Sequence, residues 1–252
     1  MKSPLQRVLN ASRVLFLGLL ILPGLSAEEI TVEALIEMAR ARVGSEEKLN
    51  GIEALRYVGV IEDEVKRQEG KLTMLLKKPL CQRLEIEMDG VHEVTAVNGY
   101  EGWIQRTRLE DGQSRVQPMN FVNVERMLNN TWENLNFFKI PKSRFGKSRY
   151  LGLTEHRGRQ AHKMETLYSG GTQFIRFFDI ETAELIATVT ETDLEIVESG
   201  MIEVEGMKFP RKIESFKNGS KIHTIRFDSV EVNPDIEAEV FEYPRKRVTI
   251  RP

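Results

Sequence analysis

Alternation of apolar and polar residues with a period of two is the feature that most constrains this chain. It is clearest in residues 81–88, where Leu84, Ile86 and Met88 share one face and mostly charged residues share the other. Because successive side chains of a β-strand point to opposite faces, this pattern predicts a strand with one apolar side. Similar strand-like runs are predicted at 57–62, 71–77, 93–97, 103–107, 161–167, 174–179, 185–190, 201–205, 212–216 and 221–232.

Short turn signals separate the predicted strands. Asp89-Gly90 directly follows the run 81–88, and an Asp-Gly pair between apolar runs is typical of a two-residue hairpin. Further turn pairs occur at 98–99, 111–112, 157–158, 170–171 and 218–219. Many strands joined by tight turns predict an antiparallel sheet, rolled or sandwiched, in a single mainly β (α+β) domain.

A helix is predicted to precede the sheet. Thr31 can cap its N-terminus and Gly44 can end it, as these residue types commonly do. Arg40 and Arg42 lie in its last turn, where positive charge suits the helix dipole. Its apolar face would consist of Leu35, Ile36, Met38, Ala39 and Val43.

A second helical pattern interrupts the strands between Met119 and Leu135. Here the period returns to about 3.6 residues. Its apolar stripe consists of Phe121, Val124, Leu128, Trp132 and Leu135. Two interpretations remain open: a helix that packs the core, or a helical plug across the mouth of a curved sheet.

The first 27 residues have the pattern of a targeting segment. Lys2, Arg7 and Arg13 make a basic start, and residues 14–22 form an unbroken apolar run. A membrane-spanning helix needs about 20 apolar residues, so this run is short for an anchor. Small residues before Ala27 suit a signal peptidase. We predict a cleaved signal peptide at 1–27, with an uncleaved anchor as the alternative.

Charge and cysteine content narrow the possible partners. Removal of residues 1–27 would leave 33 basic against 38 acidic residues, a net charge of −5. This balance argues against a nucleic-acid-binding protein, which needs a basic surface. Cys81 is the single cysteine of the sequence, so an internal disulfide and a cysteine metal cluster are excluded.

Motifs of catalysis and of tight cofactor binding are missing from the sequence. It contains no GxGxxG, P-loop, GxSxG or HExxH pattern, and these are the patterns that signal nucleotide binding, acyl transfer or zinc hydrolysis. We therefore predict a protein that is not an enzyme and that needs neither a metal nor a cofactor.

Several short motifs follow one another in order after the first predicted helix. The strand end Leu76-Lys-Lys-Pro79 precedes the run 81–88, and Asn98-Gly-Tyr-Glu-Gly-Trp103 forms the next hairpin. Later motifs are residues 159–167, Phe177-Phe-Asp179 with Leu185, Gly206-Met-Lys-Phe-Pro210, Glu231-Val-Asn-Pro234 and Phe241-Glu-Tyr-Pro244. In this order and spacing, over nearly the whole chain after residue 27, they resemble the LolA-like family of outer-membrane lipoprotein-sorting proteins.

The resemblance implies a half-barrel over residues 28–252: one strongly curved antiparallel sheet whose concave face is covered by the N-terminal helix and short helices. It implies a periplasmic monomer that shelters the acyl chains of a lipidated protein, or a related lipid, on the way to the outer membrane. Partner proteins at the inner and outer membranes would load and unload it. In the family an arginine before the strand proline ties the helical lid to the sheet. The matching residue is Lys78, which lacks the planar, multi-donor group of arginine.

Apolar residues of the helices and of the alternating strands are the candidates for lining the lipid cavity. Methionine side chains suit a cavity that accepts variable chains, although they also fill ordinary cores. The candidate residues are Leu35, Met38, Met74, Leu84, Ile86, Met88, Trp103, Phe121, Val124, Leu128 and Trp132.

Two other functions remain open. One is a periplasmic regulatory module of the RseB/MucB kind, which would use the same half-barrel to sense lipid or lipoprotein and would bind a protein partner. The other is an exported hydrolase whose catalytic residues are dispersed along the chain. Extraction of bound lipid would favour the carrier or the sensor, and a screen for esterase and glycosidase activity would detect the hydrolase.

Overall fold

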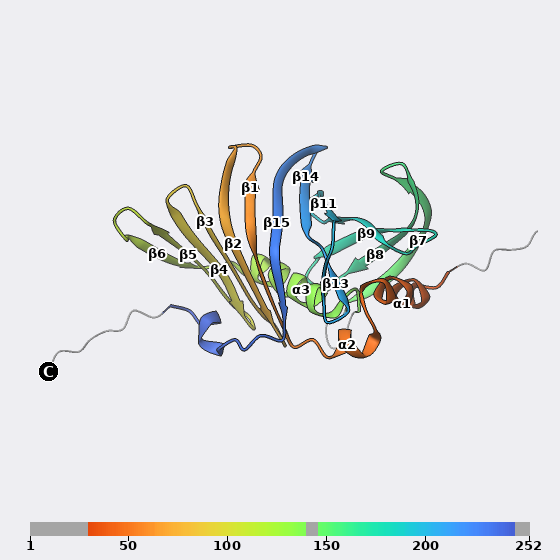
Figure 1. Cartoon of the computed structure of the whole chain (residues 1–252), viewed down its shortest axis with the longest axis horizontal. Helices are drawn as coiled ribbons and strands as arrows, with labels where there is room; N and C mark the ends of the chain where they lie inside the picture. The colour runs from red at the N-terminus through yellow and green to blue at the C-terminus, as the bar shows by residue number, and fades with distance from the viewer. Residues whose placement is uncertain (1–29, 140–145, 245–252) are drawn as a thin grey trace, which may run out of the picture. The chain divides into compact units, whose positions relative to one another are not determined.

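Thirteen antiparallel strands hydrogen-bond side by side into one large sheet (Figure 1). The structure, a computed structural model, describes residues 30–139 and 146–244, so the signal peptide predicted at 1–27 lies outside the described residues. The described residues from Thr31 onward form one compact unit. The prediction of a mainly β fold built on a curved antiparallel sheet with an N-terminal helix is confirmed.

The sheet is open, with β6 at one edge and β7 at the other. Its order from edge to edge is β6, β5, β4, β3, β2, β1, β15, β14, β11, β10, β9, β8 and β7. In chain order the strands are β1 Ala54–Asp63, β2 Gln68–Lys77, β3 Cys81–Met88, β4 Val91–Asn98, β5 Glu101–Arg108, β6 Ser114–Pro118, β7 Lys147–His156, β8 Arg159–Leu167, β9 Gln173–Asp179, β10 Leu185–Thr190, β11 Leu194–Ser199, β14 Lys212–Lys217 and β15 Ser220–Val232. A separate two-stranded hairpin consists of β12 Ile202–Val204 and β13 Met207–Phe209.

The centre of the sheet joins strands from opposite ends of the chain. β1 pairs with β15 from Leu55 opposite Val232 to Asp63 opposite His223. The register shifts between Val58 and Gly59, and a Cβ atom at Gly59 would lie 2.1 Å from the Arg226 carbonyl oxygen. Only glycine allows so close a backbone approach at this bulge.

Two helices precede the sheet, the first of them at the position that the sequence predicts. In α1, Val32–Val43, the Thr31 hydroxyl accepts a hydrogen bond from the Ala34 amide at 3.1 Å. The Gly44 amide closes the helix by donating to the Arg40 carbonyl at 3.0 Å. A short helix α2, Glu46–Asn50, follows with Ser45 as its cap. Local capping residues therefore decide where both helices begin and where α1 ends.

The third helix, α3 Phe121–Asn136, connects the two edge strands, since β6 precedes it and β7 follows it in the chain. It begins at Asn120, whose side chain accepts from the Asn123 amide at 2.9 Å. It contacts β2, β3 and β4, and Val124, Leu128 and Leu135 are buried. We call the sheet face against which α3 packs the inner face.

The largest buried cluster lies on the inner face of the central strands. Leu55, Leu72 and Leu76 of β1 and β2 pack there against Leu135 of α3 and Phe209 of the small hairpin. Burying each such side chain contributes about 1.5–3 kcal/mol. The cluster holds the helices and the hairpin to the middle of the sheet.

The outer face is covered at one end by the C-terminal segment. Trp103 is buried there beside Val94 and Ala96, and its indole nitrogen donates to the Phe241 carbonyl at 3.1 Å. Phe241 belongs to a short 3₁₀ helix, Ala238–Phe241. None of the helices in the described ranges is long and apolar enough to cross a membrane.

Candidate functional site

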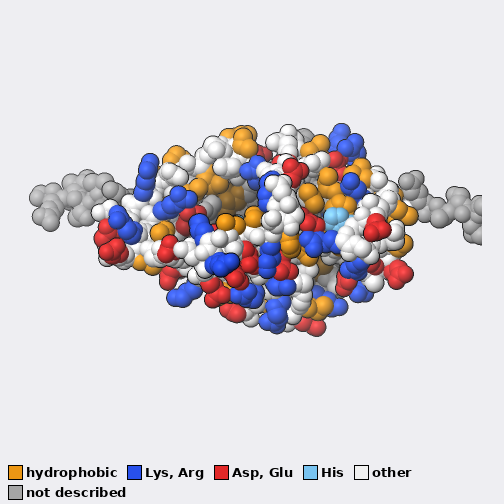
Figure 2. Space-filling model, turned by 90° about the horizontal axis from the view of Figure 1, so that it is seen from above, with side chains coloured by type: hydrophobic (Ala, Val, Ile, Leu, Met, Phe, Trp, Pro, Cys, Tyr) orange, Lys and Arg blue, Asp and Glu red, His pale blue; other side chains and the backbone are white. Residues whose placement is uncertain are grey.

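The inner face of the sheet contains a cavity of about 1050 Å³. Strands from both halves of the sheet line it, together with residues of α1, α3 and β13. Pockets that hold small ligands usually measure about 300–1,000 Å³, so this cavity is large. Figure 2 shows a hollow in the molecular surface, viewed from above, with hydrophobic side chains at its walls.

The cavity wall is apolar because neighbouring strands place aliphatic residues side by side. Ile213 of β14 lies opposite Ile225 of β15, which in turn lies opposite Ile61 of β1. Directly opposed residues of antiparallel strands share one face, so the three isoleucines form a row, of which Ile213 and Ile225 line the cavity. Further apolar lining residues are Tyr57, Leu72, Met74, Leu84, Phe174, Leu194, Ile196, Phe209 and Phe227.

A buried ion pair joins α3 to the sheet at this cavity. Arg176 of β9 is 3 % exposed, and its Nη2 lies 2.8 Å from Glu133 Oε2. The other oxygen of Glu133 accepts from the Tyr168 hydroxyl at 2.6 Å. The Arg176 guanidinium also donates to Thr166 and lies 5.2 Å from the ring centre of Phe138. Each charge of the pair is therefore compensated, as buried charges require.

The carboxyl group of Glu198 also lines the cavity, and no cation of the described residues forms an ion pair with it. Glu198 of β11 lines the cavity and lies opposite Ile213 in the sheet. Its side chain is exposed to solvent. Desolvation raises the pKa of Glu198, and the positive charge of Arg176 only partly offsets this rise. Burial also raises the pKa of Tyr57, first because of desolvation and then because of the Glu198 charge.

Basic side chains also line the cavity, and most of them are paired. Arg157 donates to both oxygens of Glu195 at 2.9 Å, and Arg159 lies 2.8 Å from Asp179. Hydrogen bonding from Arg157 lowers the pKa of Glu195. Lys208 of β13 also lines the cavity, and no carboxylate of the described residues pairs with it.

A second arginine ties the end of α3 to the two N-terminal helices. Arg40 of α1 is 2 % exposed. It donates to the carbonyl oxygens of Asn136 and Phe137, where α3 ends. It also donates to Glu46 at 2.8 Å and to the Asn50 side chain at 3.2 Å. Carbonyl groups at the end of a helix lack hydrogen-bond donors within the helix. The Arg40 guanidinium donates hydrogen bonds to two of these carbonyl groups.

The carboxylate of Glu46 should give this junction a pH dependence. Hydrogen bonds from Arg40 and then from Lys139 lower the pKa of Glu46 to about 2, below its ordinary value of 4.5. A depressed folded-state pKa stabilises the fold above about pH 4.5, and this stabilisation is lost as the pH falls towards 2. We expect Glu46→Gln to lower the free energy of unfolding at pH 6 and to have a smaller effect at pH 3, as measured by urea unfolding.

Glu47→Gln is the control for that comparison, because Glu47 has no ion-pair partner among the residues that the structure describes. It should change the free energy of unfolding little at either pH. An equal effect of Glu46→Gln at pH 6 and pH 3 would contradict the role given to the carboxylate.

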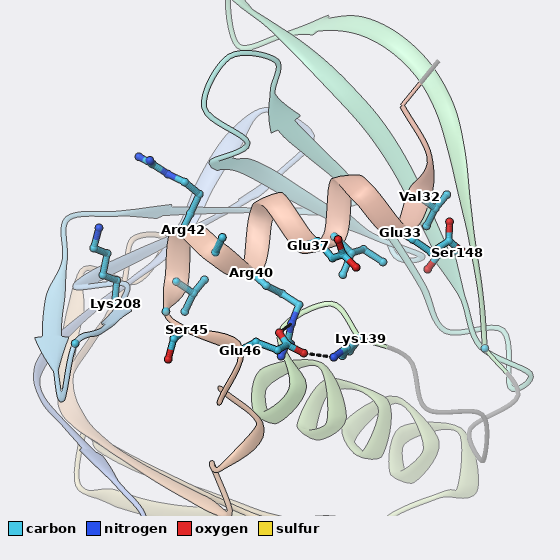
Figure 3. A pocket seen from close by; sticks show the side chains of 16 residues that line it. Val32, Glu33, Glu37, Arg40, Arg42, Ser45, Glu46, Lys139, Ser148 and Lys208 are labelled. Atoms are coloured by element: carbon cyan, nitrogen blue, oxygen red, sulfur yellow. Dashed lines mark hydrogen bonds and ion pairs between the residues drawn. The ribbon is translucent and has the colours of Figure 1, made fainter. Parts of the chain in front are cut away.

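A smaller hollow of about 850 Å³ lies beside α1 and α2 (Figure 3). Arg42, Val43 and Lys208 line both hollows. In Figure 3 Arg40 extends towards Glu46 and Lys139, whereas Arg42 points away from them. Charged residues of α1 and α2 supply much of this lining, so it suits an apolar ligand less well than the larger cavity does.

Two of the eleven candidate lining residues of the sequence analysis lie in the larger cavity, Met74 and Leu84. Ile86 and Met88 follow Leu84 on the same face of β3 but pack against the central cluster. Trp103 lies on the outer face, as described above. The sequence analysis could not separate these positions, because alternation shows which residues share a face but not where along the strand a hollow opens.

The candidates in the helices lie outside the larger cavity. Leu35 is fully buried and Met38 is exposed. Val124 and Leu128 are buried together with Val97 of β4. Phe121 is 68 % exposed at the first turn of α3. The Trp132 indole is partly buried and donates to the Lys139 carbonyl at 2.8 Å.

Lys78, the lid-latch candidate, lies beside the end of α2. Its ammonium lies 3.5 Å from the Glu53 carboxylate and 3.5 Å from the Asn50 carbonyl oxygen. Asn50 is the last residue of α2, and Glu53 belongs to the connection between α2 and β1. The observed ties to α3 come instead from Arg40 and Arg176. The sequence analysis missed both roles, because their partners lie far away in the chain.

In the described part of the chain, no three His, Cys, Asp or Glu side chains are placed to hold a metal ion. Cys81 is partly buried, and desolvation raises the pKa of its thiol. A thiol of raised pKa is a poor nucleophile at neutral pH.

Comparison with known proteins identifies the fold. No model of a protein family matches the sequence, and neither does any curated protein. Solved structures do match. A DUF1329 family protein from Desulfovibrio piger superposes with a TM-score of 0.54 at 10 % identity, over 84 % of this chain and 97 % of that one.

Two further solved structures have similar TM-scores. A LolA superfamily protein from Nitrosomonas europaea has a TM-score of 0.54 at 9 % identity, over 85 % of this chain and 98 % of its own. A domain from Vibrio parahaemolyticus, described as an outer membrane lipoprotein-sorting protein, has a TM-score of 0.52 at 9 % identity, over 82 % and 95 %. At such low identity the likeness concerns the fold alone. The chain therefore has the fold of the LolA superfamily, as the resemblance in its sequence motifs implies.

Proposed function

We propose that the protein is an exported carrier, not an enzyme, that shelters the acyl chains of a lipidated protein or a related lipid. The single observation that carries this proposal is the cavity of about 1050 Å³ on the inner face of the sheet, whose walls are largely apolar. An apolar hollow of this size in an otherwise well-packed domain is the usual form of a site for an apolar ligand.

The energetics of acyl chains explain why such a carrier is useful. Each CH₂ group gains about 0.8 kcal/mol on burial, so a sixteen-carbon chain resists transfer into water by about 12 kcal/mol. A carrier must replace most of this burial and must also release its cargo. A hollow that fits the chain loosely forgoes part of the dispersion energy of a close-packed core, which favours release.

Export and delivery to the outer membrane belong to the same proposal. They are supported by the basic and apolar start of the sequence and by the fold shared with a LolA superfamily protein and a lipoprotein-sorting domain. We propose that the chain acts in the periplasm as a monomer and that membrane proteins load and unload it.

Extraction of the purified protein tests the proposal directly. Organic solvent should release a lipid that mass spectrometry identifies, and the delipidated protein should take up a fluorescent fatty acid. A clean extract together with no uptake would contradict the proposal. A protein that binds lipid but does not transfer it between vesicles would instead favour the RseB/MucB-like lipid sensor.

A substitution that fills the cavity should abolish most of the binding. Met74 points into the cavity from β2, and Met74→Trp would place a bulky indole where the ligand lies. We expect the dissociation constant of a fluorescent fatty acid to rise about ten-fold, because a partly filled hollow buries fewer CH₂ groups. Fluorescence titration measures the change.

Thr73→Trp is the matched control. Thr73 precedes Met74 on β2, so its side chain points to the opposite face of the sheet. This variant should bind the probe as the unchanged protein does. Equal loss of binding in both variants would mean that the effect comes from damage to the strand and not from filling the cavity.

A further inference from the structure

A neutral polar side chain, that of Gln82, interrupts the apolar wall of the larger cavity. Gln82 belongs to β3, lines the cavity and is 5 % exposed. Leu76 of β2 and Val97 of β4 lie directly opposite it in the sheet, and both are fully buried. Leu84 follows it on the same face of β3 and also lines the cavity. A glutamine among such neighbours needs hydrogen-bond partners, because a buried polar group without them is costly.

The protein itself satisfies only part of the Gln82 amide. The Thr131 hydroxyl of α3 lies 2.8 Å from Gln82 Oε1 and 2.8 Å from the Met127 carbonyl oxygen. An amide group has two N–H donors and one carbonyl acceptor, and a hydroxyl meets only one end of it. If the amide oxygen faces Thr131, both N–H groups lack an acceptor; if the nitrogen faces Thr131, one N–H group still does. At least one N–H donor of Gln82 is therefore unpaired among the described residues.

The unpaired N–H group determines what a ligand of this cavity must supply. Water can satisfy the donor until a ligand fills the hollow and displaces it. Displacing a well-bound water without replacing its hydrogen bond lowers affinity, because a buried donor is then left without an acceptor. A ligand that binds tightly should therefore carry an acceptor next to its apolar chain. The carbonyl oxygen of an acyl chain that is linked through an ester or an amide bond is such an acceptor.

We propose that Gln82 is the polar recognition residue of the cavity and donates a hydrogen bond to the carbonyl oxygen of an ester-linked or amide-linked acyl chain. This inference rests on the proposed function, since it names the class of ligand for the same cavity. The apolar walls bind the chain, and the Gln82 amide distinguishes an acyl group from an alkyl chain of equal length. Thr131 is a positioning residue, because it fixes one end of the amide and so limits where the free donor can point.

Other polar groups of the cavity wall are less suited to this role. The buried guanidinium of Arg176 is engaged by Glu133. Lys208 and Glu198 are exposed, so water solvates their charges whether or not a ligand is bound. The Ser199 hydroxyl lacks a partner, but its oxygen is enclosed by the protein and is not accessible to a ligand.

Competition with a neutral fluorescent probe tests the inference with two matched amphiphiles. 1-Dodecanoylglycerol and 1-dodecylglycerol share their headgroup and chain length, but the first has a carbonyl group where the second has a CH₂ group. For the unchanged protein, dodecanoylglycerol should displace the probe at a concentration about ten-fold below that of dodecylglycerol. Gln82→Met keeps the length of the side chain and removes its donors, so the preference should fall below about two-fold.

Thr131→Val is the matched control, because it removes the same hydrogen bond from the other side and leaves the Gln82 donors in place. It should keep a preference of at least about five-fold for dodecanoylglycerol. Infrared spectroscopy of dodecanoylglycerol labelled with ¹³C at the carbonyl carbon gives a second readout. Its carbonyl band should shift to lower wavenumber on binding to the unchanged protein and to Thr131→Val, and should not shift with Gln82→Met.

The outcomes separate this inference from the proposed function. If the two amphiphiles displace the probe equally well, or if Gln82→Met keeps the preference, the inference on Gln82 is overturned and the carrier proposal stands. If Thr131→Val loses the preference as completely as Gln82→Met, Gln82 only joins β3 to α3, and the inference is again overturned. If neither amphiphile displaces the probe, the cavity does not bind acyl chains and both proposals are overturned. Circular dichroism and the unfolding midpoint confirm that each variant is folded.

Discussion

Arg176→Met is expected to lower the free energy of unfolding by about 3–5 kcal/mol, the usual cost of removing one partner from a buried ion pair. The substitution would leave the Glu133 carboxylate, whose side chain is 6 % exposed, with the Tyr168 hydroxyl as its remaining hydrogen-bond donor. Methionine replaces much of the length of arginine, so lost volume contributes little. Urea unfolding at pH 7 measures the effect.

Two further variants show whether charge causes this loss. Arg176→Met combined with Glu133→Gln should recover a large part of the stability, because the amide needs no counter-charge and can still accept from Tyr168. Arg126→Met removes another ion pair of α3, to Glu191 in the turn between β10 and β11, but Arg126 is 41 % exposed, so the cost should stay below about 1 kcal/mol. A loss below about 1 kcal/mol for Arg176→Met itself would contradict this account.

Arg40→Ala is expected to lower the free energy of unfolding by about 2–4 kcal/mol. The guanidinium satisfies two carbonyl groups at the end of α3 and links them to Glu46 and Asn50 of α2. Hydrogen bonds to a charged group are worth about 1.5–3 kcal/mol, and a buried acceptor left without a donor costs about 1–3 kcal/mol. Hydrogen exchange should accelerate in the last turn of α3, because these contacts hold that turn to α1 and α2.

Arg42→Ala provides the matched control for Arg40→Ala. Both arginines belong to α1, but Arg42 is 50 % exposed and lies 4.0 Å from Glu184, so the expected cost is below about 0.5 kcal/mol. Arg40→Lys should recover little, since an ammonium group cannot reach several acceptors in different directions as the planar guanidinium does. Equal stability of the Arg40 and Arg42 variants would show that the end of α3 is held by apolar contacts alone.

These two arginines also show how much of the binding site depends on contacts between distant residues. Arg176 and Glu133 are 43 positions apart, and Arg40 and Asn136 are 96 apart. Nothing in the local sequence distinguishes Glu133 or Arg176 from the other charged residues. The family resemblance directed attention to Lys78, which the fold places at the connection between α2 and β1.

Strand prediction succeeded where alternation coincides with a hairpin and failed at several other positions. β3 and β4 follow from the alternation around Leu84 and the Asp89-Gly90 turn, and the observed bounds enclose the predicted ones. The strands β6, β7, β11 and β13 were not predicted. β6 and β7 form the edges of the sheet, where fewer side chains are buried and the apolar pattern is weak.

The sequence by itself determined the local elements: the ends of α1 at Thr31 and Gly44, the alternating strands with their turns, and the amphipathic helix that became α3. These depend on capping, on turn chemistry and on side-chain period, which act within a few residues. The tertiary structure alone decided which face of each strand lines the cavity. Trp103 lies on the outer face because the C-terminal segment covers it there. Glu198 faces the cavity because β11 pairs with β14. Both outcomes require segments far apart in the chain to meet, and pairing over such distances is set by the burial of the whole sheet and not by any local pattern.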